Sequence, residues 1–275
     1  MKKTDNKHYI GITGVADKRE LLMIVERCKD LSLPTNYHLN VGVLLSYHTF
    51  NGVMPHNPIY PDKNATFDLL EIISEKGWNP VIHYTSTSPE TLSNQVFEIF
   101  NHKQVFKRSI CRTIQLNVMS PEPQELVKIY KEIPDLKVIL QVPMWWNHLA
   151  TLKSLCLFTK TYADFVSYLL FDSSGGYGKE LTMDTLKVIS SIVHNLPVHI
   201  GISIAGGLSD ANVFEKCLQI RSVIHRDFSI DSQAKLRGRI KGQKKIGNHV
   251  NSEKVNFYIL NAINALTQIS DDRVE

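Results

Sequence analysis

The apolar positions of the chain gather in short runs that are rich in β-branched residues and recur about every 30–35 residues, the spacing of a repeated βα unit. Each run is long enough for one buried strand. The strands predicted in this way lie at residues 8–13, 39–45, 79–84, 109–118, 137–142, 165–171, 198–204 and 227–230. Between many of them, apolar residues recur instead at the spacing of an amphipathic helix. The helices predicted lie at 18–31, 65–76, from the capping residues 85–88 to 100, from 120–122 onward, at 209–218 and at 252–266.

Strands of this apolarity, alternating with helices, indicate a parallel sheet that is covered on both faces. An open doubly wound sheet is the rival arrangement, and it would most naturally bind a nucleotide at its first glycine turn. The turn here, Gly11-Ile12-Thr13-Gly14, is neither GxGxxG nor a P-loop. Eight strands in 275 residues, without a linker-like stretch, therefore predict one α/β domain over residues 1–275, a (β/α)₈ TIM barrel.

Composition removes several classes of protein. Hydrophobic residues make up 43% and charged residues 21% of the chain, as in an ordinary globular protein. No apolar stretch is long enough to span a membrane, and the basic N-terminus lacks the apolar core of a signal peptide. The four cysteines show neither disulfide-framework nor zinc-site spacing. We therefore expect a cytoplasmic protein with no membrane contact, no metal and no cofactor.

Charge is uneven along the chain, which has a net charge of +4. The stretch 235–245 holds six Lys or Arg residues and no acid, and it could attract a phosphate or a nucleic acid. Its simplest interpretation is a solvated loop. Because no aromatic residue is interleaved with these charges, nucleic-acid binding ranks last among the functions considered. A second unusual segment, 46–63, is polar and too long for a standard βα loop, which makes it a candidate lid.

Phosphate in such barrels commonly binds at the loops after the last two strands. Here Ala205, Gly206 and Gly207 follow the seventh predicted strand, and two glycines let main-chain amides approach an anion closely. Asp231, Ser232 and Gln233 follow the eighth and supply further donors. These six residues are the predicted phosphate site, with a phosphorylated small molecule as the ligand.

Candidate acid–base groups also stand at predicted strand ends. Asp172 follows the sixth strand and precedes a glycine loop with Gly175, Gly176 and Gly178, which suits a general acid or base beneath a closing loop. An equally simple interpretation is a turn aspartate. His48 and His83 are expected at the mouth as further catalytic candidates. The pair Trp145 and Trp146 could stack on a planar ring or pack in the rim.

Five collinear segments resemble the phosphoribosylanthranilate isomerase family, a tryptophan-pathway barrel that binds a ribulose phosphate. The family's motifs KICGIT…ED, QLHG, LLD…GGTGK, LAGGLNPENV and VDVSS correspond in order to short segments that span nearly the whole chain. The corresponding segments are Gly11-Ile12-Thr13 with Asp17, Gln115-Leu116-Asn117, Tyr168 to Lys179, Ile204 to Leu208 with Asn212-Val213, and Ile230-Asp231-Ser232.

The resemblance implies an Amadori rearrangement with a cysteine base on strand one and an aspartate acid on strand six. Asp172 matches the acid, whereas Ile10 stands where the cysteine belongs, at the expected floor of the pocket. The arginine that holds the anthranilate carboxylate in the family has no counterpart, since residues 46–49 read Ser-Tyr-His-Thr.

Two functions remain open. One is an isomerase or lyase acting on a phosphoribosyl compound or sugar phosphate with an altered substrate. The other is a non-catalytic barrel that kept the phosphate site and lost the chemistry. Ile10 favours the binder, and Asp172 with its glycine loop favours the enzyme. Assembly into a homo-oligomer is compatible with either function.

Overall fold

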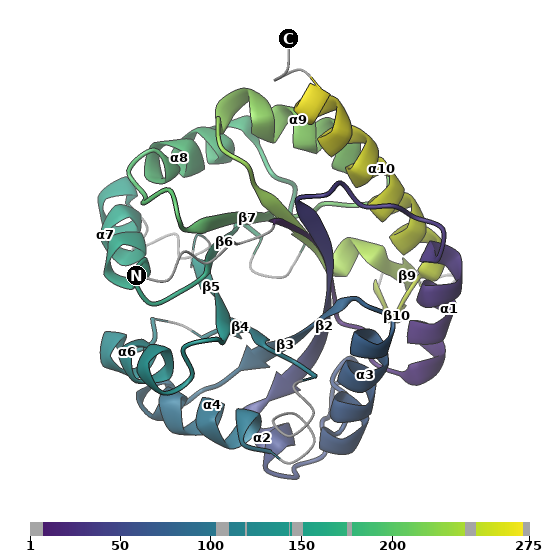
Figure 1. Ribbon diagram of the computed structural model, residues 1–275, viewed down its shortest axis with the longest axis vertical. Helices are drawn as coiled ribbons and strands as arrows, with labels where there is room; N and C mark the ends of the chain where they lie inside the picture. Colours follow the sequence, from purple (N-terminus) through teal and green to yellow (C-terminus); the bar gives the residue numbers. More distant parts are fainter. Residues whose placement is uncertain are drawn as a thin grey trace.

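A computed structural model describes residues 8–102, 110–118, 120–142, 144, 151–174, 178–239 and 246–271. Eight parallel strands pair in sequence order, and β8 pairs with β1, so the sheet closes into a barrel (Figure 1). The predicted fold class, a (β/α)₈ barrel, is confirmed. The strands are β1 His8–Thr13, β2 Tyr37–Ser46, β3 Asn79–Thr85, β4 Thr113–Asn117, β5 Lys137–Val142, β6 Tyr168–Asp172, β7 Gly201–Ala205 and β8 Ser229–Ser232.

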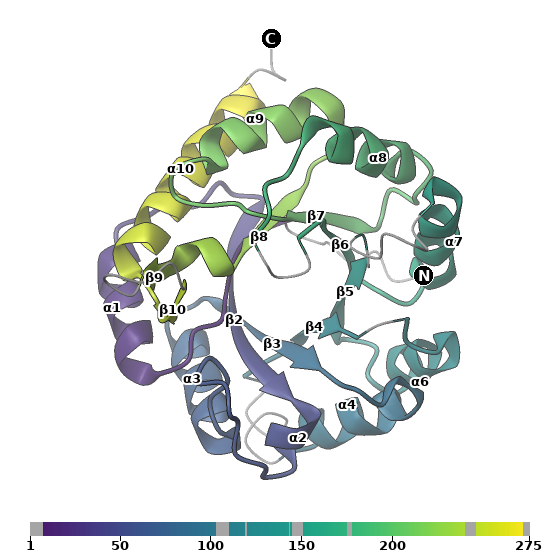
Figure 2. The ribbon, with the colours of Figure 1, turned by 180° about the vertical axis from the view of Figure 1, so that it is seen from behind.

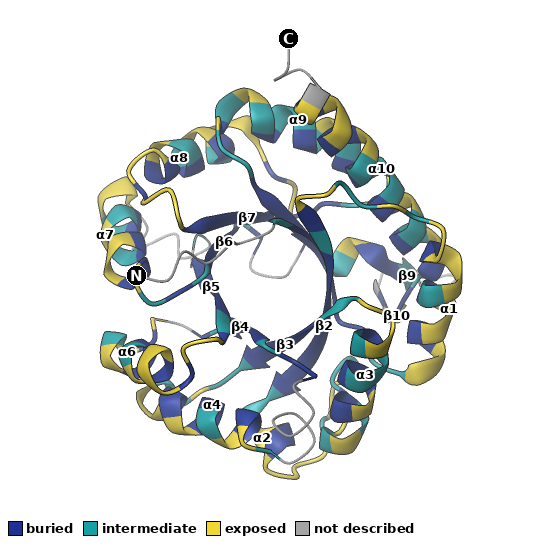
Figure 3. Cartoon of the chain, in the orientation of Figure 1, coloured by how far each residue is buried: buried dark blue, intermediate teal, exposed yellow. Residues whose placement is uncertain are grey.

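Helices surround the barrel and bury their apolar faces against it, while their outer faces are exposed (Figure 3). None of the described helices has the length and apolarity that a membrane crossing requires. The α-helices are α1 Lys18–Cys28, α2 Tyr47–Phe50, α3 Lys63–Glu75, α4 Leu92–Phe100, α6 Pro123–Glu132, α7 Leu152–Tyr162, α8 Met183–Val193, α9 Val213–Val223 and α10 Ser252–Asp271. Two 3₁₀ turns are η1 Pro89–Thr91 and η2 Ala234–Leu236.

Strand bounds agree with prediction at β1 and β5, whereas β8, predicted at residues 227–230, lies two residues further along the chain at both ends. The ladder to β1 pairs Ile10 with Ile230 and Ile12 with Ser232. Asp231 and Ser232 therefore lie within the strand, both buried, and not in the turn after it. The prediction located this strand by its apolar residues Phe228 and Ile230. Because the strand ends in two buried polar residues, the predicted range lies too close to the N-terminus.

Two predicted helix starts are wrong. Residues 85–88 make no side-chain cap, because η1 precedes α4 and neither turn has a capping hydrogen bond. The helix expected from Ser209 begins at Val213, since the Asn212 side chain accepts from the Ser209 amide (2.8 Å) and donates to the Gly207 carbonyl (3.1 Å). The turn after β7 is thus braced by a side chain before the helix starts.

A pair of antiparallel strands, β9 Arg237–Arg239 and β10 Ile246–Val250, was not predicted, and β9 lies within the basic stretch 235–245. The pair lies beside α1 (Figure 2). Arg237 is buried and donates to the carbonyls of Gly14 and Asn248. The buried carboxylate of Glu20 accepts from the amides of Ala16 and Val250. This part of the basic stretch is therefore a packed element and not a solvated loop.

Candidate functional site

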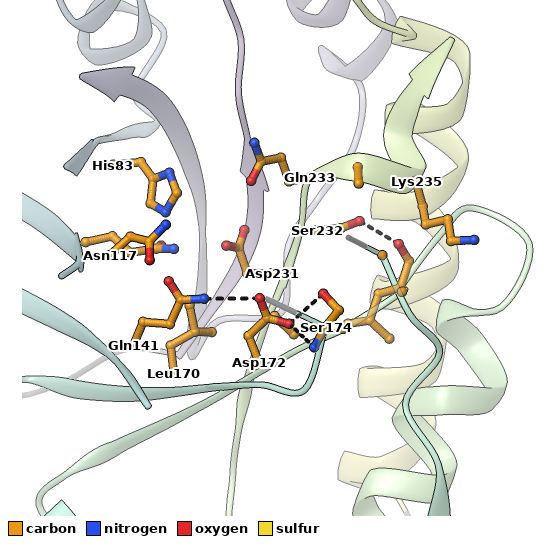
Figure 4. A pocket seen from close by; sticks show the side chains of 17 residues that line it. His83, Asn117, Gln141, Leu170, Asp172, Ser174, Asp231, Ser232, Gln233 and Lys235 are labelled. Carbon is orange, nitrogen blue, oxygen red and sulfur yellow. Dashed lines mark hydrogen bonds between the residues drawn. The ribbon is translucent and has the colours of Figure 1, made fainter. Parts of the chain in front are cut away.

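A cavity of about 60 Å³ opens where β3 to β8 end (Figure 4). It collects residues from the two late turns, the end of β6 and the polar ends of β3 to β5. The lining residues are His83, Gln115, Asn117, Gln141, Leu170, Asp172, Ser174, Gly178, Ala205, Gly206, Gly207, Leu208, Asp231, Ser232, Gln233, Ala234 and Lys235. The six predicted phosphate-site residues, Asp172, His83 and Gly178 therefore share one pocket. Gly175, Gly176, Trp145 and Trp146 lie outside the described residues.

The turns after β7 and β8 are joined directly, because the Ser232 hydroxyl donates to the Leu208 carbonyl at 2.5 Å. Gly206 and Gly207 have φ of 121° and 66°, values that favour glycine. A Cβ on Gly207 would lie 2.6 Å from the Lys179 carbonyl oxygen, so glycine also lets the loop after β6 pack onto this turn.

Main-chain amides in these turns are available to a ligand. Within the described part of the chain, the amides of Gly206, Gly207 and Gln233 donate to no protein acceptor. Lys235 adds a cationic side chain on the same side of the pocket (Figure 4). Amides at a glycine turn together with an ammonium group make an environment that favours an anion.

Asp172 ends β6 and is buried with its carboxylate facing the pocket (Figure 4). Its Oδ1 accepts from the amide and the hydroxyl of Ser174, at 2.8 and 2.7 Å. Its Oδ2 accepts from Nε2 of Gln141 at 3.1 Å. The bonds from Ser174 make Asp172 a turn aspartate, which is one of its two interpretations from sequence, and its role as a general acid or base stays a prediction. The bond from Gln141, on the neighbouring strand β5, fixes the orientation of the Asp172 carboxylate.

Asp231 is a second buried carboxyl group in the same pocket. The Thr13 hydroxyl donates to its Oδ1 and Oδ2, at 3.1 and 3.3 Å. Its pKa is raised from 3.8 to about 7; burial is the main cause and the charge of Asp172 adds to it, while hydrogen bonds from Thr13, Gln115 and the Ser232 amide oppose the rise. The side chain that sequence reasoning assigned to phosphate binding is therefore a carboxyl group that titrates near neutral pH.

The β1 residue beside Asp231 is Gly11, with which it is in register. A Cβ on Gly11 would lie 2.5 Å from the Asp231 carboxylate oxygen, so the carboxylate occupies the space that a larger β1 side chain would fill. Tyr9 faces the barrel interior, where its hydroxyl donates to Ser203. Since side chains alternate along a strand, Ile10 faces outward, and it belongs to the helix-packed core. The expectation that Ile10 forms the pocket floor is wrong.

The two candidate histidines differ in position. His48 does not line the pocket: Ser46 caps the one-turn helix α2, and His48 is exposed on it. His83 does line the pocket, and burial lowers its pKa to about 4. Its imidazole is therefore neutral at physiological pH and a weak base.

Sequence reasoning did not single out Gln141. The available signal was a polar residue near the end of an otherwise apolar strand, at the inward position of the alternation. Gln115 and Asn117 on β4 give the same signal, and they entered the sequence analysis only through the family resemblance.

No family model matches the sequence, and no curated protein matches it. Solved structures match its fold. Phosphoribosyl anthranilate isomerase from Thermococcus kodakaraensis is 15% identical, with a TM-score of 0.54 over 94% of this chain and 99% of that one. The native KDPGal structure is 13% identical, with a TM-score of 0.52 over 96% of each chain. A cube-shaped, highly porous protein cage, designed by fusing symmetric oligomeric domains, is 12% identical, with a TM-score of 0.52 over 97% of this chain and 74% of that one. These likenesses show the barrel fold alone.

Proposed function

We propose that this chain is an isomerase or lyase that acts on a phosphorylated sugar or phosphoribosyl compound. The observation that carries the proposal is the shared pocket of Asp172 and Asp231, bordered by the turns after β7 and β8. Acid–base groups and an anion-binding environment within one small cavity are what proton transfer on a phosphorylated substrate requires.

The phosphate end of the substrate would bind at the turns. The main-chain amides of Gly206, Gly207 and Gln233 donate to no acceptor among the described residues. Lys235 lines the same pocket. A phosphate placed nearer the two carboxylates would be repelled by them. The anion is therefore held at one side of the pocket, and its binding energy orients the reacting carbons at the other.

Asp231 would supply the base that the family resemblance leaves unfilled. A carboxyl group with a pKa of about 7 exchanges its proton at physiological pH. In an aldose–ketose or Amadori-type step, Asp231 takes the proton from the carbon beside the carbonyl or imine. Asp172, in its protonated form, gives a proton to the carbonyl oxygen or imine nitrogen. Asp231 then returns its proton to the former carbonyl or imine carbon, while Asp172 takes a proton from the hydroxyl group of the carbon that lost its hydrogen. In a lyase the same base would take a hydroxyl proton; the carbon–carbon bond then breaks as that hydroxyl becomes a carbonyl, and the electron pair passes to the substrate's own carbonyl group as an enolate, which takes a proton from the protonated form of Asp172.

The non-catalytic alternative loses its main support. It was favoured by Ile10, whose side chain faces the helices and does not enter the pocket. A protein that only binds phosphate also has little use for two carboxylates beside an anion, since each weakens binding. The enzyme is therefore the function that the pocket supports better.

Binding and catalysis can be tested separately. Inorganic phosphate and a panel of pentose and hexose phosphates are expected to raise the melting temperature of the wild-type protein. Gly207→Ala should abolish this stabilisation, because the new Cβ meets the Lys179 carbonyl. Gly77→Ala is the matched control, since Gly77 also has a positive φ (74°) but no neighbour within 4 Å.

Proton transfer is then followed by NMR in deuterated water. Deuterium should enter the substrate carbon beside the carbonyl with the wild-type protein and fail to do so with Asp231→Asn. Stabilisation without deuterium uptake from any phosphate in the panel would support the binding protein. The absence of stabilisation by every phosphate would remove the ligand class.

A further inference from the structure

The wall of the pocket opposite the phosphate turns is polar but carries no charge among its described residues. This wall, which we call the neutral wall, is formed by His83 on β3, Gln115 and Asn117 on β4, and Gln141 on β5. Figure 4 shows His83, Asn117 and Gln141 on this side of the pocket. The strand register places His83 directly beside Gln115. Because burial lowers the pKa of His83 to about 4, the wall is uncharged at physiological pH.

Two atoms of the neutral wall are buried without a hydrogen-bond partner in the described structure, Oε1 of Gln141 and Nδ1 of His83. Gln141 and His83 are only 7% and 5% exposed. An unpartnered polar atom at such depth is costly, and the cost is recovered when a ligand supplies the missing partner.

The orientation of the Gln141 amide follows from its neighbour. Its Nε2 donates to the Asp172 carboxylate at 3.1 Å. The flipped amide would put an oxygen against a carboxylate oxygen, so the observed assignment is the stable one. Oε1 of Gln141 is therefore an acceptor that needs a donor from the ligand.

We propose that the substrate end remote from the phosphate is an uncharged chain of hydroxyl groups, as in an open-chain sugar phosphate. This inference rests on the proposed function and narrows its substrate class. A hydroxyl group donates to Oε1 of Gln141 and has lone pairs left to accept from a neighbour such as His83. One group type thus satisfies both unpartnered atoms.

A ring that carries a carboxylate fits the same wall poorly. A carboxylate has no proton to donate to Gln141, and it would lie near the carboxyl groups of Asp172 and Asp231. The cation among the described lining residues, Lys235, is on the phosphate side (Figure 4). The wall therefore selects against an anthranilate-like end and for a polyol.

Isothermal titration of the whole protein with four probes tests the inference. The probes are inorganic phosphate, a pentitol monophosphate, n-pentyl phosphate and 4-carboxybutyl phosphate. The pentitol phosphate should bind at least about tenfold more tightly than the pentyl phosphate, as expected for two or more added hydrogen bonds. The carboxybutyl phosphate should bind more weakly than the pentyl compound.

Gln141→Met removes the unpartnered acceptor at similar volume, and it should reduce the preference for the pentitol over the pentyl compound about fivefold or more. Gln219→Met, on the outer helix α9, is the matched control and should leave the preference unchanged. The wild-type comparison decides the question even if Gln141→Met does not fold.

Each outcome separates the two proposals. Equal affinity for the pentitol and pentyl compounds, with inorganic phosphate still bound, would overturn this inference and leave the proposed function standing. Tighter binding of the carboxybutyl compound than of the pentitol would do the same. If none of the four probes binds, the proposed function fails and the inference fails with it.

Discussion

Asp231→Asn should increase the stability of the folded protein at pH 8 much more than at pH 5. Folded Asp231 has a pKa of about 7 because of its burial, whereas the same group in the unfolded chain ionises near its ordinary value of 3.8. A group with a raised folded-state pKa stabilises the fold at low pH, and that contribution is lost as the pH rises toward the folded value. Above about pH 7 both states are ionised, and the loss is complete.

The size of the effect follows from the pH interval. Between pH 5 and pH 7 the unfolded chain is ionised at this position and the folded chain is protonated. Each pH unit then costs the folded state about 1.4 kcal/mol, which gives about 3 kcal/mol over the two units. Asparagine has no such titration and keeps the hydrogen-bonding capacity toward Thr13 and Gln115. The variant should therefore gain about 3 kcal/mol relative to wild type when the pH is raised from 5 to 8.

Urea unfolding of both proteins at pH 5, 6, 7 and 8 measures this difference directly, because the pH dependence from all other groups cancels between them. Asp68→Asn removes an exposed carboxylate on α3 and serves as the control; its stability should follow the wild type at every pH. Curves for wild type and Asp231→Asn that run parallel from pH 5 to 8 would refute the buried-charge reasoning. A variant equally destabilised at each pH would show that the hydrogen bonds of Asp231 outweigh its charge.

Three further outcomes are expected. If Asp231 is the base, kcat/KM for the substrate should rise with pH up to about 7 and then level off, because the ionised form is the active one; an assay that shows activity falling over this range would assign it the role of acid. Gly201→Ala should lower the free energy of unfolding in urea by about 1–3 kcal/mol, since its Cβ would overlap the buried ring of Tyr168; an unchanged midpoint would mean that the ring moves freely. Arg226 donates to five main-chain carbonyls in the segment that precedes β7. Arg226→Lys should lower the melting temperature by about 5 °C, because lysine lacks the planar guanidinium group that makes several of these bonds at once. A melting temperature equal to that of the wild type would show that the positive charge alone is sufficient.

The barrel was predictable because its signal repeats. Eight apolar runs at similar spacing fix the class of fold even when single boundaries are displaced by two or three residues, as for β6 and β8. Helices α7 and α8 lacked such redundancy and were not predicted. The strand pair of β9 and β10 was missed because its buried Arg237 pairs with main-chain carbonyls, a partner type that leaves no pattern in composition.

The site was predictable only where local sequence determines geometry. Two glycines in succession after a strand indicated the turn after β7, and the structure gives both a positive φ. The role of Asp231 was not predictable in this way. A residue in the turn after a strand would face a ligand and stay hydrated. Asp231 instead lies one position inside the strand and points inward, so it loses contact with water and its pKa rises.

The same register explains why the missing cysteine is weak evidence against catalysis. Proton transfer needs a titratable atom at a given point in the pocket, and it does not matter which strand supplies that atom. In this barrel β1 contributes Gly11, whose lack of a side chain leaves room for the Asp231 carboxylate of the adjacent β8. A sequence comparison confined to β1 finds Ile10 in place of the cysteine and indicates that the catalytic base is lost, although Ile10 faces the helices. The structure instead has the carboxyl group of Asp231, which titrates near neutral pH, beside Gly11. The carboxylate of Asp172 on β6 lies in the same pocket. Two carboxyl groups in different environments are the pair that acid–base chemistry requires.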